Sequence, residues 1–76
     1  MKVQVRLAGH LSEYGQSRDV AAEVANGSKV SDLIAALGIP RGEVGTVYLD
    51  GAGALTDALL RDGCKVELFP PIAGGS

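Results

Sequence analysis

The chain has 76 residues, about half the length of a typical single domain, which leaves room for one modest core. Apolar residues make up 46% of the chain but aromatic residues only 4%, so Val, Leu, Ile and Ala must form that core. The formal net charge of −2 provides no basic surface for nucleic acid or for an anionic membrane, and we expect neither as a partner.

Two strands are predicted in the first third of the chain. Strict alternation of polar and apolar residues over 2–7 is typical of a half-buried strand, and the same pattern returns over 18–24 after a polar stretch. We expect the two strands to form a hairpin. The side chains predicted to face the core are Val3, Val5, Leu7, Val20, Ala22 and Val24.

A helix is predicted after the break at Asn26-Gly27. Ser28 is positioned to cap its first turn, and Asp32 would oppose the helix dipole there. Gly38 and Pro40 then end it. The apolar residues recur with a spacing of three or four and form one stripe, which should cover a sheet: Val30, Leu33, Ile34 and Leu37.

The second half of the chain is predicted to hold further strands. Residues 44–50 read as a strand with Val47 and Leu49 on the buried face, followed by a turn at Asp50-Gly51. A short strand or turn is expected around Ala54 and Leu55, and then one helical turn over 57–60.

The last strand is predicted over residues 64–69, after the turn signal Asp62-Gly63. Alternation places Cys64, Val66 and Leu68 inward and Phe69 outward. The element order β-β-α-β-(β)-β with one long helix predicts an α+β fold, a mixed sheet covered on one face by one main helix, which is the β-grasp pattern. We expect a β-grasp domain over residues 1–69 and a flexible tail over 70–76.

The tail reads Phe-Pro-Pro-Ile-Ala-Gly-Gly-Ser and differs from an ordinary frayed terminus. From Pro70 to Gly75 an extended chain reaches at most roughly 20 Å, enough to enter a buried site in a partner. Pro70 and Pro71 keep its base extended. Gly74 and Gly75 lack side chains, so a narrow channel can close around the backbone.

The segments "LDG", "LLRDGCKVELFPP" and "IAGG", together with the element order, resemble the ubiquitin-like sulfur-carrier family, most closely the small subunit of molybdopterin synthase. The resemblance covers the whole chain. It implies that a ubiquitin-activating-type enzyme uses ATP to adenylate the terminal glycine. A sulfur donor then replaces AMP, and the resulting thiocarboxylate delivers sulfur to a cofactor precursor held by an acceptor synthase, such as the large molybdopterin synthase subunit.

The resemblance assigns adenylation and the thiocarboxylate to Gly75. Ile72, Ala73 and Gly74 would thread into the partner's active site. Phe69, Pro70 and Pro71 form the candidate partner interface, because exposed aromatic side chains often anchor interfaces. The alternative for Phe69 is that Tyr48 or a neighbouring loop covers it.

Ser76 departs from the family pattern, in which the second glycine is the terminus. An amide at Gly75 leaves no free carboxylate for ATP, so the chain ending at Ser76 is expected to be inactive. Three explanations stay open: a protease removes Ser76 from a precursor, Ser76 is left over from a linker, or activity has been lost.

No catalytic residues and no metal site are predicted, and no cofactor is expected to be bound. Cys64 should be a buried, inert thiol. His10 is predicted to lie in a solvated loop without metal-ligating neighbours. Asp57 and Asp62 are more simply a cap and a turn residue than an acid–base pair.

The location expected for the protein is the cytoplasm. A single cysteine forms no internal disulfide, the first ten residues lack the apolar block of a signal peptide, and no apolar run approaches the roughly 18 residues of a membrane helix. Two classes of function stay open: a sulfur carrier acting through Gly75, as the resemblance implies, or an interaction protein. The second is either a modifier joined through Gly75 to lysines of targets or a binding module with an inert tail.

Overall fold

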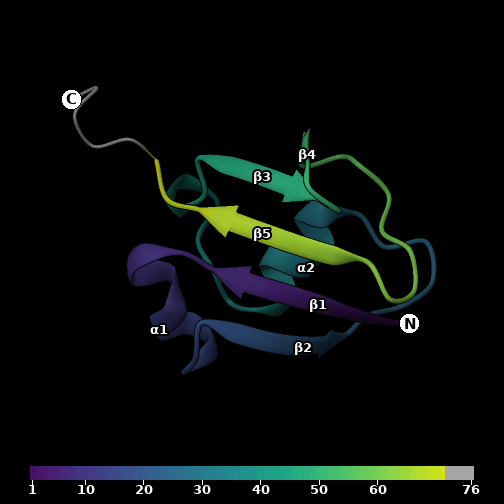
Figure 1. Cartoon of the computed structure of the whole chain (residues 1–76), viewed down its shortest axis with the longest axis horizontal. Helices are drawn as coiled ribbons and strands as arrows, with labels where there is room; N and C mark the ends of the chain where they lie inside the picture. Colours follow the sequence, from purple (N-terminus) through teal and green to yellow (C-terminus); the bar gives the residue numbers. More distant parts are fainter. Residues whose placement is uncertain (72–76) are drawn as a thin grey trace.

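The computed structural model describes residues 1–71, which form a five-stranded mixed sheet with the order β2-β1-β5-β3-β4 (Figure 1). The first two strands form the predicted hairpin, and the third and fourth form a second one. The strands are β1 (Lys2–Leu7), β2 (Asp19–Glu23), β3 (Thr46–Leu49), β4 (Ala52–Ala54) and β5 (Lys65–Phe69).

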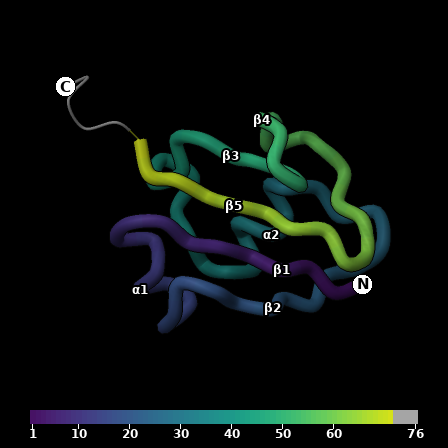
Figure 2. The backbone as a smooth tube through the Cα atoms, viewed as in Figure 1, coloured from purple at the N-terminus to yellow at the C-terminus, as the bar shows by residue number. Residues whose placement is uncertain are grey.

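Strand β5 lies in the middle of the sheet, between the two hairpins (Figure 2). It runs parallel to β1, with Val5 beside Val66 and Leu7 beside Leu68, and antiparallel to β3. Parallel pairing of the first and last strands requires a crossover, and the helix between the hairpins supplies it. The predicted mixed sheet is therefore confirmed, and its last strand is flanked on both sides.

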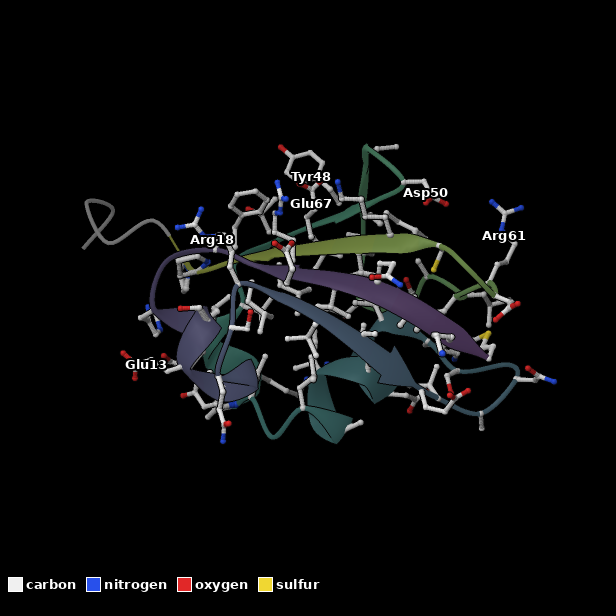
Figure 3. The ribbon with its side chains drawn as sticks, turned by 60° about the horizontal axis from the view of Figure 1, so that its bottom comes forward. Glu13, Arg18, Tyr48, Asp50, Arg61 and Glu67 are labelled. Carbon is white, nitrogen blue, oxygen red and sulfur yellow. The ribbon has the colours of Figure 1, made fainter. Side chains whose placement is uncertain are left out.

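Helix α2 (Val30–Ala36) covers one face of this sheet (Figure 3). It begins one residue later than predicted: the cap is Lys29, whose N–H donates to the Asp32 carboxylate at 2.8 Å, and Ser28 does not cap it. Asp32 thus satisfies one backbone donor and also opposes the helix dipole. Gly38 follows with φ of +76°, the left-handed conformation that ends helices.

The core lies between α2 and the sheet. Val20 and Leu37, predicted to lie in the core, are half-buried and pack against it. Leu11, Ile39 and Leu60 were missed by the prediction. The buried apolar residues are Val3, Val5, Leu7, Leu11, Val30, Leu33, Ile34, Ile39, Val47, Leu60, Cys64, Val66 and Leu68.

Short helices lie in two connections for which the sequence analysis predicted no helix. They are η1 (Gly9–Leu11), α1 (Ser12–Gly15) and η2 (Arg41–Glu43). The first two follow β1, and Leu11 from η1 is completely buried. The third precedes β3, which is two residues shorter at its start than predicted.

The helical turn predicted over residues 57–60 is wrong. The N–H of Val30 donates to the Ala58 carbonyl at 3.0 Å, and the N–H of Leu60 donates to the Ser28 carbonyl at 2.9 Å. Leu59 pairs with Lys29 in an isolated bridge. The first N–H groups of a helix need acceptors from outside it, and the Ala58 carbonyl supplies one of them.

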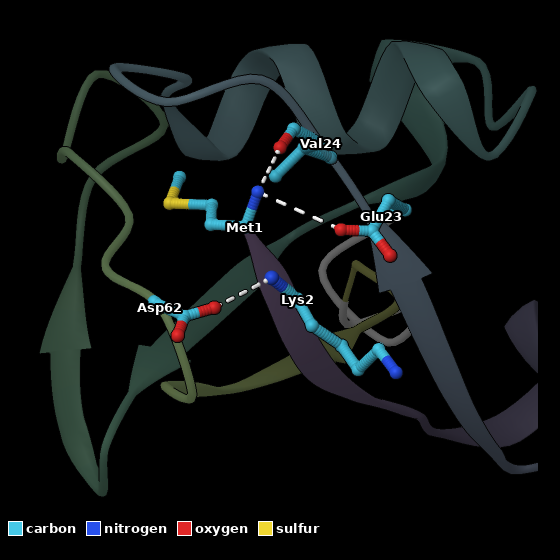
Figure 4. Close-up of polar contacts among 5 residues, drawn as sticks. All are labelled: Met1, Lys2, Glu23, Val24 and Asp62. Carbon is cyan, nitrogen blue, oxygen red and sulfur yellow. Dashed lines mark hydrogen bonds and ion pairs between the residues drawn. The ribbon is translucent and has the colours of Figure 1, made fainter.

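Hydrogen bonds of the amino terminus and of the Asp62 side chain stabilise the end of the sheet where β1 begins (Figure 4). The Met1 amino group donates to the Val24 carbonyl at 2.7 Å, and the N–H of Lys2 donates to the Asp62 carboxylate at 2.8 Å. Asp62 is thus a turn residue, as predicted. Because β1 and β5 are parallel, β5 ends at the opposite end of the sheet (Figure 1).

Candidate functional site

The candidate site is the point where the chain leaves the sheet after β5, which we call the tail root and define as Phe69, Pro70 and Pro71. The N–H of Ala8 donates to the Leu68 carbonyl at 3.0 Å, and the N–H of Gly45 donates to the Phe69 carbonyl at 2.7 Å. Proline has no N–H and cannot continue the ladder. The tail therefore departs from the centre of the sheet and has a neighbouring chain segment on each side.

Phe69 lies on the face of the sheet away from α2 and is half-buried. The Tyr48 ring packs edge-to-face against it, with centroids 5.6 Å apart and planes at 84°. Figure 3 shows Tyr48 on this outer face, where it remains 37% exposed. Phe69 was predicted to be either an exposed interface residue or a residue covered by Tyr48, and each prediction is confirmed in part. Tyr48 covers some of the Phe69 ring, and the two rings together leave an apolar surface beside the tail root.

A shallow groove of about 440 Å³ follows the tail root, and we call it the root groove. Thr46 and Tyr48 from β3 form one side of it, and Phe69, Pro70 and Pro71 form the other. The structure brings together the three residues predicted for the partner interface and adds Tyr48 to them. Alternation on neighbouring strands could have found Tyr48, because it faces outward on β3 as Phe69 does on β5.

Two glycines touch the tail root, and nothing in the sequence singled them out for this role. A Cβ built on Gly45 would lie 2.5 Å from Pro71 Cα and 2.8 Å from Pro71 N, both backbone atoms. A Cβ on Gly9 would lie 3.3 Å from the Pro70 ring. Gly9 closes the end of β1 and Gly45 precedes β3, so the two glycines form the opposite walls of the exit.

The loops that carry these glycines are joined by a side-chain contact. His10 Nε2 lies 2.6 Å from Glu43 Oε1, which connects η1 with η2 across the exit. Both side chains are partly exposed. His10 therefore has a specific partner, which corrects the prediction of a simply solvated loop residue.

The other singled-out side chains lie away from the tail root. Cys64 is a free thiol, 5% exposed, and it faces the core as predicted. Within residues 1–71 no three His, Cys, Asp or Glu side chains gather as they would around a metal ion. In the same part of the chain, no helix has the length and apolar character needed to cross a membrane.

Five residues named in the sequence analysis lie outside the described residues. They are Ile72, Ala73, Gly74, Gly75 and Ser76. Their predicted roles in threading, adenylation and processing stay predictions, as does the flexibility predicted for the tail.

Comparison with known proteins adds a family and several solved folds. The model of the ThiS family matches residues 5–75. No curated protein sequence matches the chain significantly. This match covers all of the sheet except the first three residues of β1, and it includes the Gly74-Gly75 pair.

Three solved structures share the fold. SAMP1 from Haloferax volcanii is 25% identical with a TM-score of 0.75, covering 99% of this chain and 100% of that one. A chain of the complex of subunits 1 and 2 of molybdopterin-converting factor from Helicobacter pylori is 26% identical with a TM-score of 0.63, covering 99% and 100%. A Pyrococcus furiosus protein assigned as subunit 1 of such a factor is 23% identical with a TM-score of 0.76, covering 95% and 99%. These likenesses confirm the β-grasp, ubiquitin-like fold.

Proposed function

The chain belongs to the ThiS family of ubiquitin-like sulfur carriers, and from that premise we propose that it carries sulfur on the carboxyl group of Gly75. The observation that carries the proposal is the extent of the family match, which runs from residue 5 in β1 through the other four strands and ends at Gly75. The tail root supports it, because the chain leaves the sheet beside an apolar groove suited to a partner.

The proposed reaction uses the carrier as a cosubstrate rather than as a catalyst. A partner of the ubiquitin-activating type binds ATP, and the Gly75 carboxylate attacks the α-phosphate and releases pyrophosphate. A hydrosulfide equivalent from a sulfur donor then forms a C–S bond as the C–O bond to AMP breaks. The product is a thiocarboxylate, and AMP leaves with the oxygen. ATP use and the free thiol of Cys64 both fit a cytoplasmic protein.

This reaction requires a free carboxyl group at Gly75. In the sequence Gly75 is joined to Ser76 by an amide bond, which has no carboxylate to react with ATP. We propose that hydrolysis of this bond by a protease precedes activation.

The proposed acceptor is the large subunit of a molybdopterin synthase or an equivalent enzyme. Support comes from the Helicobacter pylori complex, in which subunits 1 and 2 of molybdopterin-converting factor are associated and one chain shares this fold. The alternative is a protein modifier, which the likeness to SAMP1, a small archaeal modifier protein, favours. Both functions begin with activation of Gly75 and differ in whether sulfur or a lysine amine receives the acyl group.

Three chain lengths test the proposal in an assay of ATP–pyrophosphate exchange with the cognate adenylating enzyme. The chain ending at Gly75 should support exchange, and the chain ending at Ser76 should not. A chain ending at Gly74 should also be silent, because its carboxylate falls about 3.5 Å short of the phosphate. Removal of Ser76 should leave the melting temperature unchanged, since one terminal residue contributes little burial.

Two results would contradict the proposal. Exchange by the chain ending at Ser76, without proteolysis, would show that hydrolysis is not required. Silence of all three chains, with an enzyme that is active on another carrier, would favour a binding module with an inert tail.

A further inference from the structure

We infer that Gly45 is a positioning residue, whose missing side chain sets the direction in which the tail leaves the sheet. The inference concerns a residue outside the tail itself, on the loop before β3. Its consequence for sulfur transfer rests on the proposed function, whereas its effect on the tail direction does not.

The contact between Gly45 and the tail root is closer than any side chain permits. A Cβ at position 45 would lie 2.5 Å from Pro71 Cα, 2.8 Å from Pro71 N and 3.1 Å from the Pro70 carbonyl carbon. All three are backbone atoms, so rotation of a side chain cannot relieve the overlap. One of the two backbone segments must move if position 45 carries any residue other than glycine.

Pro70 and Pro71 are the part of the tail root that would move. Gly45 is held by its N–H bond to the Phe69 carbonyl at 2.7 Å, and the next residue, Thr46, pairs with Phe69 in the sheet. Neither Pro70 nor Pro71 has an N–H to donate, and within residues 1–71 no hydrogen bond reaches their carbonyls. The ladder therefore fixes Gly45, and the direction of the chain after Phe69 gives way.

The opposite wall of the exit limits where the tail can go. The Pro70 ring packs on Gly9, which has φ of +56° and so occupies the left-handed region. The contact between His10 and Glu43 at 2.6 Å holds the Gly9 loop and the Gly45 loop together. The tail root thus lies between two backbone segments, and a methyl group added on the Gly45 side must displace Pro71 from its present position.

The direction of the tail matters because the root groove and the tail must bind the same partner at the same time. When the root groove docks on the activating enzyme, the tail has a high effective concentration only along directions that lead into the active site. A small misplacement of a reacting group costs about 10²-fold in rate. We therefore expect Gly45→Ala to lower kcat/KM for adenylation at least about tenfold.

Gly45→Ala is a clean substitution, and the chain offers matched controls. Gly45 has no positive φ, and the three atoms nearest to an added Cβ all belong to the tail root. Gly42 and Gly53 also lack a positive φ, and a Cβ on either would meet no atom within 4 Å. Gly42→Ala and Gly53→Ala thus control for the general effect of replacing glycine. Gly9 is unsuitable, because its positive φ would strain any other residue.

The first measurement needs no partner enzyme. Spin labels on Ile72→Cys and Glu13→Cys, in a Cys64→Ala background, report the distance between the tail just beyond its root and the body. Gly45→Ala should shift this distance distribution, and the two control substitutions should leave it as in the parent. An unshifted distribution in Gly45→Ala would overturn the inference.

The second measurement is adenylation kinetics on chains ending at Gly75. Gly45→Ala should lose kcat/KM while Gly42→Ala keeps it, at melting temperatures that differ little. If Gly45→Ala shifts the distance between the two labels but keeps the kcat/KM of the parent, Gly45 has no positioning role in adenylation. Should the parent itself be silent, the proposed function fails, and the distance measurement still decides the inference about direction.

A second variant covers the case in which Gly45→Ala does not fold. Pro71→Gly removes the fixed φ from the tail root and touches no residue of the core, since Pro71 is exposed. We expect it to broaden the distance distribution and to lower kcat/KM. A distribution no broader than the parent's would show that the tail root does not set the direction.

Discussion

The core beneath α2 and the tail root are held by opposite means. Leu33, Val66 and Leu68 are completely buried, and branched aliphatic side chains fill the space between the helix and the sheet. At the tail root two backbone segments meet directly, because Gly45 has no side chain and Pro71 lies against it. The core is stabilised by the side chains that fill it. The tail root is positioned by a close backbone contact that the missing side chain of Gly45 allows.

This difference predicts which changes each region tolerates. A smaller residue in the core leaves a cavity and costs free energy of unfolding in proportion to its size. A larger residue at position 45 costs little free energy of unfolding, because Pro70 and Pro71 make no hydrogen bond within residues 1–71 and can be displaced. The core therefore determines whether the protein folds, and the root determines where its tail points.

The largest effect on stability is expected from Leu33→Ala in the core. Leu33 is a completely buried residue of α2 and belongs to the core. Its truncation should lower the free energy of unfolding by roughly 2–5 kcal/mol. Urea denaturation measures this change. Leu55→Ala is the control, because Leu55 is 75% exposed and should change stability by less than about 0.5 kcal/mol. Equal free energies of unfolding for Leu33→Ala and Leu55→Ala would show that the buried Leu33 side chain does not stabilise the core.

A smaller effect on stability but a clear effect on binding is expected from Tyr48→Ala beside the root. The substitution removes an edge-to-face contact with Phe69, worth about 0.5–1.5 kcal/mol of folding. It also empties one side of the root groove, so affinity for the activating enzyme should fall by about 2 kcal/mol, as at interface hot spots.

Isothermal titration calorimetry compares this variant with Leu59→Ala. Leu59 is 61% exposed, pairs with Lys29 and does not line the root groove. Its removal should leave the affinity unchanged. An equal loss of affinity in Tyr48→Ala and Leu59→Ala would mean that the partner does not bind at the root groove.

The smallest effect is expected from Glu43→Gln, which keeps a hydrogen-bonding side chain and removes the charge beside His10. Both side chains of the pair are partly exposed, so stability should change by no more than about 1 kcal/mol. Thermal unfolding measures it, with Glu13→Gln as the control for removing an exposed carboxylate. A loss comparable to that of Leu33→Ala would place this contact within the cooperative core.

The periodic parts of the fold could be predicted because their physics repeats along the chain. Alternation identified β1 and β5, and turn chemistry identified Asp50-Gly51, where both residues adopt positive φ. Leu11 and Leu60 were missed because they lie outside any periodic segment, and a single apolar residue in a loop carries no signal of burial.

The errors and omissions arise from contacts between distant segments. Residues 57–60 form no helical turn because their backbone meets the start of α2, about thirty residues away in sequence. Gly45 could not be identified as part of the exit, because a glycine in a loop has many ordinary explanations. Phe69 and the prolines were found from their order in the sequence, whereas Tyr48 and Gly45 required the structure.

The central claim, that Gly75 carries sulfur, is tested most directly by the intact mass of the carrier. The chain ending at Gly75 is incubated with ATP, the activating enzyme and a sulfur donor, and the chain ending at Ser76 serves as the control. The account predicts that the first gains the mass difference between sulfur and oxygen and that the second keeps its mass. An unchanged mass of the chain ending at Gly75, with an enzyme that forms the thiocarboxylate on another carrier, would contradict it.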